Sequence, residues 1–124
     1  MKYIIPWLTI VIMTQNLYAK VTEKKFRKQS PVTQVHLLEL YSTQSCSSCP
    51  PAQEWVSKLK NSNQLWQKFV PIVFHVDYWD YLGWKDPYSQ PQYSARQRQY
   101  AKEWQSSSAY TPMLVIDGQE THIK

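Results

Sequence analysis

Several features that assign a chain to a common class are scarce or absent in this sequence. It has no internal repeat and no low-complexity segment, and its 124 residues include only two cysteines and three histidines. The histidines are His36, His75 and His122, and their spacing is unlike that of zinc-finger ligands. The sequence therefore indicates neither a repeat protein nor a zinc finger.

The net charge of +5 is confined to the beginning of the chain. Residues 1–31 hold six of the 14 Lys and Arg side chains and only one of the nine Asp and Glu side chains, Glu23. The remaining eight positive and eight negative side chains make residues 32–124 neutral overall. A nucleic-acid-binding domain carries its positive charge on the folded surface, so this distribution disfavours nucleic acid as a partner.

The first residues have the pattern of a secretory signal peptide. Lys2 precedes an apolar core at residues 3–13, and we expect cleavage after the small residue Ala19. The core is shorter than the ~20 residues that span a bilayer as a helix, and an uncleaved N-terminal anchor is the alternative interpretation. No stable membrane span is expected after cleavage.

The residues after the signal divide into an arm and one domain. Residues 20–31 are polar and charged, which predicts a basic flexible arm. Residues 32–124 are enough for one domain with one core. We expect this domain to be exported, periplasmic or secreted, in surroundings where two cysteines can form a disulfide.

The two cysteines, Cys46 and Cys49, lie between two predicted elements. An apolar run at residues 35–41 predicts a central strand, and apolar residues at i, i+3, i+4 and i+7 predict an amphipathic helix over residues 48–60. The prolines that follow Cys49 are tolerated in the first turn of a helix, where N–H groups have no intrahelical partner. The cysteine pair is therefore expected at the start of the helix.

This placement favours redox chemistry. The thiolate is the nucleophile in disulfide exchange, and the partial positive charge of a helix N-terminus stabilises it. We therefore predict that Cys46 attacks the substrate and that Cys49 resolves the mixed disulfide.

The rest of the chain predicts three more strands and a second helix. A buried strand is expected at residues 70–76, a helix at 93–106 and a strand at 113–116. Asp117 followed by glycine is the strongest hairpin signal in the chain, and it predicts a return strand over residues 120–124.

Glu39 is an unexpected carboxylate within the first predicted strand. It either relays a proton during dithiol exchange, with a pKa raised by burial, or lies at the sheet margin bonded to backbone N–H groups. The sequence leaves both interpretations open.

An aromatic stretch at residues 77–84 follows the second predicted strand. It either lines a substrate groove through Tyr78, Trp79 and Trp84, or packs as core under a long loop. Because neighbouring parallel strands end at the same sheet edge, Asp77 and Asp80 are expected near Cys46. There they would oppose the thiolate and raise its pKa.

The order of these elements resembles the thioredoxin fold, with a CxxC motif at a helix start and a Thr-Pro before the last hairpin. More closely, SCSSCPPA together with HVDYWDYLGWKDP and RQRQYA resembles a family of exported bacterial thioredoxin-like proteins of unknown function. The resemblance covers about residues 35–118. It implies an α/β fold with a central mixed sheet and flanking helices.

By this resemblance Cys46, Cys49, Pro112 and Glu39 match functional positions. Pro112 is expected to be cis and to face the dithiol, and the backbone of Thr111 to hold an extended substrate. Members of the family are longer, so the resemblance implies that the final strand is incomplete and the closing helix missing, in a fragment or a truncated product.

Three functions are compatible with these residues. The first is an extracytoplasmic thiol–disulfide oxidoreductase that needs no cofactor and acts on a protein or a small thiol or disulfide. The second is a non-catalytic interaction module with a structural disulfide. The third is copper or zinc handling by the CxxC with His36, His75 or His122, and the histidine spacing disfavours it.

Overall fold

A computed structural model describes residues 25–29 and 31–122 of the chain. The predicted signal at residues 1–19 and the first part of the predicted arm lie outside the described residues. The described elements, in chain order, are β1 (His36–Ser42), α1 (Pro50–Lys58), a short 3-10 helix (Leu59–Asn61), β2 (Phe69–His75), α2 (Pro91–Glu103), β3 (Met113–Ile116) and β4 (Gln119–Thr121).

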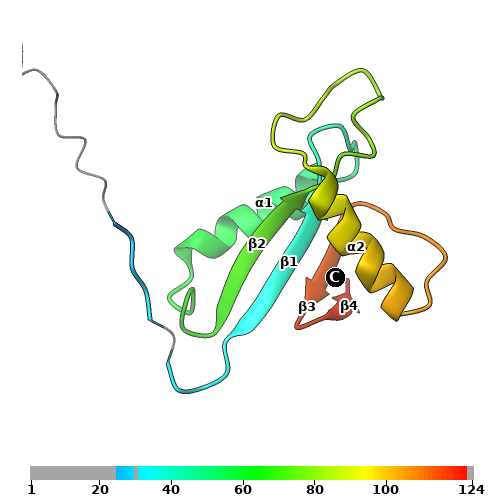
Figure 1. Cartoon of the computed structure of the whole chain (residues 1–124). Coiled ribbons are helices and arrows are strands. Elements are labelled where there is room, and N and C mark those ends of the chain that lie inside the picture. The colour runs from blue at the N-terminus through cyan, green and yellow to red at the C-terminus, as the bar shows by residue number, and fades with distance from the viewer. Residues whose placement is uncertain (1–24, 30, 123–124) are drawn as a thin grey trace, which may run out of the picture.

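The strands form one mixed sheet in the order β2-β1-β3-β4. β1 is parallel to β2 and antiparallel to β3, and β3 and β4 form an antiparallel hairpin. Figure 1 shows the parallel pair crossing the molecule, with α1 and α2 on either side of the sheet and the long loop between β2 and α2 beyond the ends of these strands. The described part of the chain is therefore a mixed α/β structure.

The alternation of side chains along β1 divides the core into two layers. Leu38 and Leu40 are buried with Ala52 of α1 in one apolar cluster. Tyr41 is buried in a second cluster, where Tyr100 of α2 packs against it. Each helix therefore covers its own face of β1.

Local sequence signals located these elements well. Each predicted strand and helix overlaps an observed one, and the predicted strand at residues 113–116 has the same bounds as β3. The predicted hairpin is confirmed: Asp117 and Gly118 both have positive φ, 49° and 80°, which a two-residue turn of this kind requires. Asp117 also accepts a hydrogen bond from the backbone N–H of Leu37, which fastens the turn to β1.

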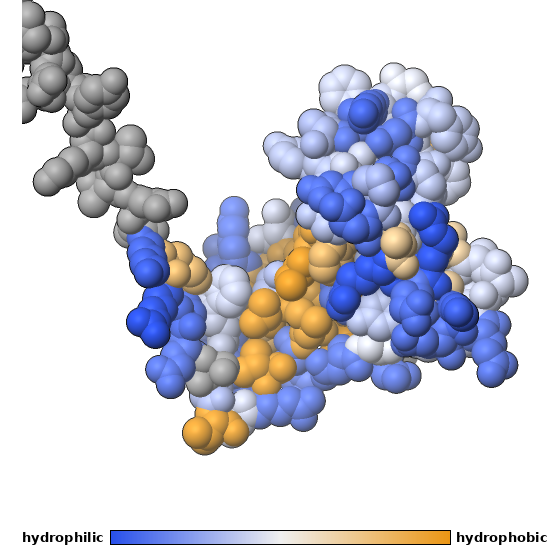
Figure 2. Space-filling model, viewed as in Figure 1, coloured by the Kyte–Doolittle hydropathy of each residue, from blue (hydrophilic) through white to orange (hydrophobic). Residues whose placement is uncertain are grey.

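The prediction of a buried position for the second strand was wrong. β2 forms one edge of the described sheet, and its central residues Ile72 and Val73 are 38% and 36% exposed. Figure 2 shows apolar side chains at the surface over β1 and β2. An apolar run predicts that a segment forms a strand, but it does not distinguish a central strand from an edge strand.

No helix among the described residues is long and apolar enough to cross a membrane. The apolar stretch at residues 3–13 lies outside that part of the chain.

Candidate active site

Cys46 and Cys49 form a disulfide at the end of the loop that joins β1 to α1. Their Cα atoms are 5.4 Å apart. Cys49 is the N-cap residue of α1, and Pro50 and Pro51 occupy its first turn. The helix thus begins two residues later than predicted, because the backbone N–H of Gln53 makes the first helical bond, to the carbonyl of Cys49.

The two sulfur-bearing residues differ in exposure. Cys49 is completely buried, whereas Cys46 is partly exposed. The Sγ atom of Cys46 lies 3.4 Å from Oγ of Ser48, close enough for a hydroxyl-to-sulfur hydrogen bond. Only Cys46 is therefore open to attack by, or on, a molecule in solution.

The loop that precedes β3 lies beside the disulfide. The peptide bond between Thr111 and Pro112 is cis, as expected. The hydroxyl of Ser48 is 3.5 Å from the carbonyl oxygen of Thr111, so this loop and the cysteine loop are in contact. Ser48 and Pro112 also line a hollow of about 330 Å³ with Pro51 and Leu114.

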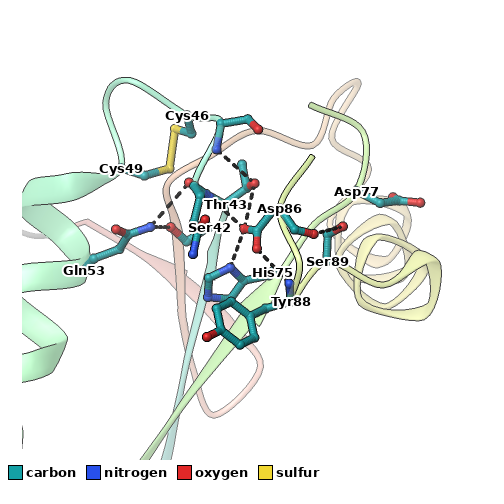
Figure 3. Close-up of polar contacts among 12 residues, drawn as sticks. Ser42, Thr43, Cys46, Cys49, Gln53, His75, Asp77, Asp86, Tyr88 and Ser89 are labelled. Carbon is teal, nitrogen blue, oxygen red and sulfur yellow. Dashed lines mark hydrogen bonds and ion pairs between the residues drawn. A yellow bond between two sulfur atoms is a disulfide. The ribbon is translucent and has the colours of Figure 1, made fainter. Parts of the chain in front are cut away.

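Thr43 is a buried junction beneath the cysteines (Figure 3). Its carbonyl oxygen accepts hydrogen bonds from the backbone N–H of Cys46 at 3.3 Å and from the side chain of Gln53 at 3.4 Å. Its hydroxyl accepts a bond from the backbone N–H of Ser45 and donates to Asp86. The hydroxyl and the backbone carbonyl of Thr43 thus hold both ends of the cysteine loop.

Asp86 connects this junction to the long loop and to β2. Its side chain is fully buried and accepts hydrogen bonds from the backbone N–H of Gln44 at 2.7 Å, the hydroxyl of Thr43 at 3.1 Å, Nδ1 of His75 at 2.6 Å and the backbone N–H of Tyr88 at 2.9 Å. Burial alone raises the pKa of Asp86, but the bonds from His75, Gln44 and Tyr88 outweigh burial and hold the pKa below its ordinary value. Asp86 is therefore an ionised carboxylate with all its oxygens bonded.

Asp77 and Asp80 were expected near Cys46, but neither forms a hydrogen bond with the cysteine loop. Asp77 bonds the hydroxyl of Ser94 on α2 and points away from the disulfide (Figure 3). Asp80 accepts a hydrogen bond from the hydroxyl of Ser89 at 2.6 Å within its own loop. The carboxylate that reaches the cysteine loop is Asp86, which no pattern in the sequence had indicated.

The aromatic stretch lies partly against the site. Nε1 of Trp84 donates to the side chain of Gln44 at 3.0 Å, and Nε1 of Trp79 donates to the hydroxyl of Thr111 at 2.9 Å. Tyr78 instead packs into the second apolar cluster, and its hydroxyl donates to Gln97 of α2. Tyr78, which is half-buried, thus packs as core, as one interpretation expected. Trp84 is 58% exposed, and its role in a substrate groove stays a prediction.

Glu39 is completely buried, but its partners differ from both expectations. One carboxylate oxygen accepts from Nε of Arg96 at 2.6 Å and from the hydroxyl of Tyr41, and the other accepts from the hydroxyl of Tyr100 at 2.6 Å. Glu39 therefore faces α2, on the side of the sheet opposite to α1 and Cys49. A proton relay through Glu39 stays a prediction, and this geometry gives the carboxylate a structural role.

Within residues 25–29 and 31–122, no three His, Cys, Asp or Glu side chains lie close enough together to hold a metal ion. Of the three histidines, His36 and His75 are each bonded to an aspartate, Asp117 and Asp86 respectively.

A family model described as "Protein of unknown function (DUF1223)" matches residues 37–124, which include the disulfide, all of β1 except its first residue, and every later element. The chain belongs to the DUF1223 family. No curated protein matches the chain.

One crystal structure similar to this DUF1223 chain is that of protein AGR_C_4864 from Agrobacterium tumefaciens. The two are 32% identical and superpose with a TM-score of 0.63. The match covers 72% of this chain and 40% of that chain, so the present chain spans less than half the length of this relative.

Arg96→Met in this DUF1223 chain should lower the free energy of unfolding by about 3 kcal/mol, because it leaves the buried carboxylate of Glu39 without its cation. Urea denaturation of the purified protein measures the change. Arg98→Met, on an exposed position of the same helix, is the control and should change stability by less than about 0.5 kcal/mol. Equal effects of the two substitutions would show that Glu39 does not depend on Arg96.

The lowered pKa of Asp86 predicts a pH dependence of stability. An aspartate whose folded pKa is below its unfolded value, about 3.9, stabilises the fold above that pH and loses this contribution as pH falls through the folded pKa. Between pH 5 and pH 2 the parent should therefore lose more unfolding free energy than Asp86→Asn does. Asp77→Asn, in the same loop, should follow the parent, and parallel curves for the parent and Asp86→Asn would contradict the assignment.

Proposed function

We propose that this chain is a thioredoxin-like thiol–disulfide oxidoreductase that acts outside the cytoplasm. The observation that carries the proposal is the unequal exposure of the disulfide at the start of α1, with Cys46 accessible and Cys49 buried. A dithiol that exchanges with substrates needs one sulfur that meets the substrate and a second that meets only the first.

The exchange proceeds in two balanced steps. In the reduced protein the Cys46 thiolate attacks one sulfur of a substrate disulfide, which forms a mixed disulfide and releases the other substrate sulfur as a thiolate. The Cys49 thiolate then attacks Sγ of Cys46, which re-forms the intramolecular disulfide and releases the second substrate thiol. The substrate gains two electrons and the protein loses two; the reverse sequence oxidises a substrate dithiol.

Two groups stabilise the thiolate of Cys46. The N-terminus of α1 places partial positive charge at the cysteine pair. Pro50 and Pro51 lack N–H groups, so the helix supplies fewer hydrogen-bond donors than an ordinary first turn. The hydroxyl of Ser48, 3.4 Å from the sulfur, has one proton, which it can turn from the carbonyl of Thr111 to a Cys46 thiolate. It would then donate the hydrogen bond that the prolines do not.

The order of elements supports the thioredoxin-like interpretation. A strand leads into the CxxC and a helix, a parallel strand and a second helix follow, and the cis Thr111–Pro112 bond precedes a hairpin that joins the same sheet. This is the order that the resemblance implied.

The substrate would lie along the edge of the site that Cys46 faces. Thr111 and Pro112 border the disulfide from the β3 side, through the contact with Ser48. Exposed Trp84 borders the cysteine loop through Gln44. We propose Thr111, Pro112 and Trp84 as substrate contacts, with Trp79 holding Thr111 in place; Tyr78, engaged by α2, is the weakest of the predicted contacts.

Export is part of the proposal. It rests on the signal-like pattern of residues 1–19 and on the disulfide, since disulfides persist in oxidising compartments such as the periplasm.

Single cysteine variants test the roles of the two sulfurs. Reduced Cys49→Ser should form a stable mixed disulfide with glutathione at Cys46, because no second sulfur resolves it. Cys46→Ser should react at least about 100-fold more slowly, because its remaining thiol is buried. Intact-mass spectrometry after mixing with glutathione disulfide follows both reactions.

Equal rates for the two variants would contradict the assigned roles. A protein in which neither thiol reacts while the fold is intact would favour the alternative, an interaction module with a structural disulfide.

A further inference from the structure

The long loop between β2 and α2 reaches the cysteine loop through one buried carboxylate, which the exchange reaction does not itself use. We propose that Asp86 and Thr43 are positioning residues that set the balance between the disulfide and the dithiol of Cys46 and Cys49. The proposal rests on the proposed function and extends it to residues that touch neither sulfur.

The geometry gives a continuous path of bonds from Asp86 to the nucleophile. Oδ2 of Asp86 accepts from the hydroxyl of Thr43 and from the backbone N–H of Gln44, two residues before Cys46. The carbonyl of Thr43 in turn accepts a hydrogen bond from the backbone N–H of Cys46, and its hydroxyl accepts one from the backbone N–H of Ser45. Four of the bonds that hold the backbone before the exposed sulfur thus pass through Thr43 and Asp86.

Asp86 is well suited to hold this loop, because it is itself fixed. It is 1% exposed, and its two oxygens accept four hydrogen bonds, two of them from outside the cysteine loop: Nδ1 of His75 on β2 and the backbone N–H of Tyr88. If a buried carboxylate moves away from its donors, its charge is left both desolvated and without hydrogen bonds, and this costs a large free energy. The loop is therefore tied to the end of β2 and not to a mobile surface group.

Two effects of this tie favour the disulfide. Once the sulfur–sulfur bond is reduced, the bonds through Thr43 act together with the bond from the backbone N–H of Cys49 to the carbonyl of Cys46 to keep the two cysteines close. They thus raise the effective concentration of one thiol at the other. The negative charge of Asp86 beneath the loop also opposes a thiolate on Cys46. Loss of either the charge or the bonds should shift the protein toward its reduced form.

The test is the equilibrium of the full chain with mixtures of reduced and oxidised glutathione. Asp86→Asn removes the charge, and Thr43→Val removes the hydroxyl at nearly constant volume. Each should lower the equilibrium constant for disulfide formation about tenfold, the factor expected for one lost hydrogen bond to a charged group. Thr43→Ser keeps the hydroxyl and should return to within about twofold of the parent.

Asp77→Asn is the matched control. It neutralises a carboxylate of the same loop that bonds Ser94 instead of the cysteine loop, and should leave the constant unchanged. Far-UV circular dichroism and the melting temperature of every variant show whether it is folded, and Thr43→Val keeps the test open if Asp86→Asn does not fold.

The outcomes separate this proposal from the proposed function. If the parent equilibrates with glutathione but Asp86→Asn and Thr43→Val share its constant, the positioning role is overturned and the oxidoreductase stands. If Thr43→Ser shifts as far as Thr43→Val, the hydroxyl is not the group that acts, which also overturns it. A parent disulfide that glutathione does not reduce overturns the proposed function and this inference with it.

Discussion

β1 is enclosed on four sides, and the site depends on that enclosure. β2 and β3 pair with its two edges, and α1 and α2 cover its two faces. Its last residue, Ser42, and the next, Thr43, are completely buried, so the chain leaves the sheet at a fixed point. The cysteine loop starts from that point, which is why a short surface loop can hold two sulfurs in a defined arrangement.

Two buried carboxylates stabilise this arrangement in different ways. Glu39 pairs with the guanidinium of Arg96, which also lies 5.5 Å from the centres of the Phe74 and Tyr100 rings, and it fastens α2 to the sheet. Asp86 relies on backbone and hydroxyl donors together with His75. Each is matched to donors as a buried charge requires, and no buried side-chain N or O atom of the described residues lacks a hydrogen bond.

The difference in exposure between Cys46 and Cys49 follows from the same geometry. Cys49 is the N-cap of α1 and lies under the loop, whereas Cys46 is lifted toward solvent by the turn that Thr43 holds. The helix end, the hydroxyl of Ser48 and the carboxylate of Asp86 then act on the exposed sulfur with opposite effects. In the proposed function, the first two favour the thiolate and the third opposes it, so the reactivity of Cys46 would depend on the balance between them.

Much of the fold was predictable because its signals are local. The apolar run before the cysteines, the two prolines after Cys49 and the turn at Asp117 each determine a few neighbouring residues. The edge position of β2 was not predictable, because strand order depends on which segments meet in space. Its apolar residues are compatible with either position.

The candidate site was predictable in its cysteines and less so in its support. Because parallel strands end at the same sheet edge, the 77–84 stretch was predicted to lie near the cysteines. Trp84 does contact the cysteine loop, through Gln44. The shared edge does not determine which carboxylate of a long loop turns inward, and Asp86 is separated from Gln44 by 42 positions. Glu39 and Arg96 are 57 positions apart, and nothing in either local sequence indicates the pairing.

The central claim is that the Cys46–Cys49 disulfide is redox-active, and its reduction potential tests this most directly. Equilibration of the purified protein with a glutathione buffer at pH 7, followed by thiol alkylation and mass spectrometry, gives the potential. The account predicts a value between about −120 and −270 mV, the range of exchanging CxxC proteins. A potential below about −300 mV, typical of structural disulfides, would contradict it.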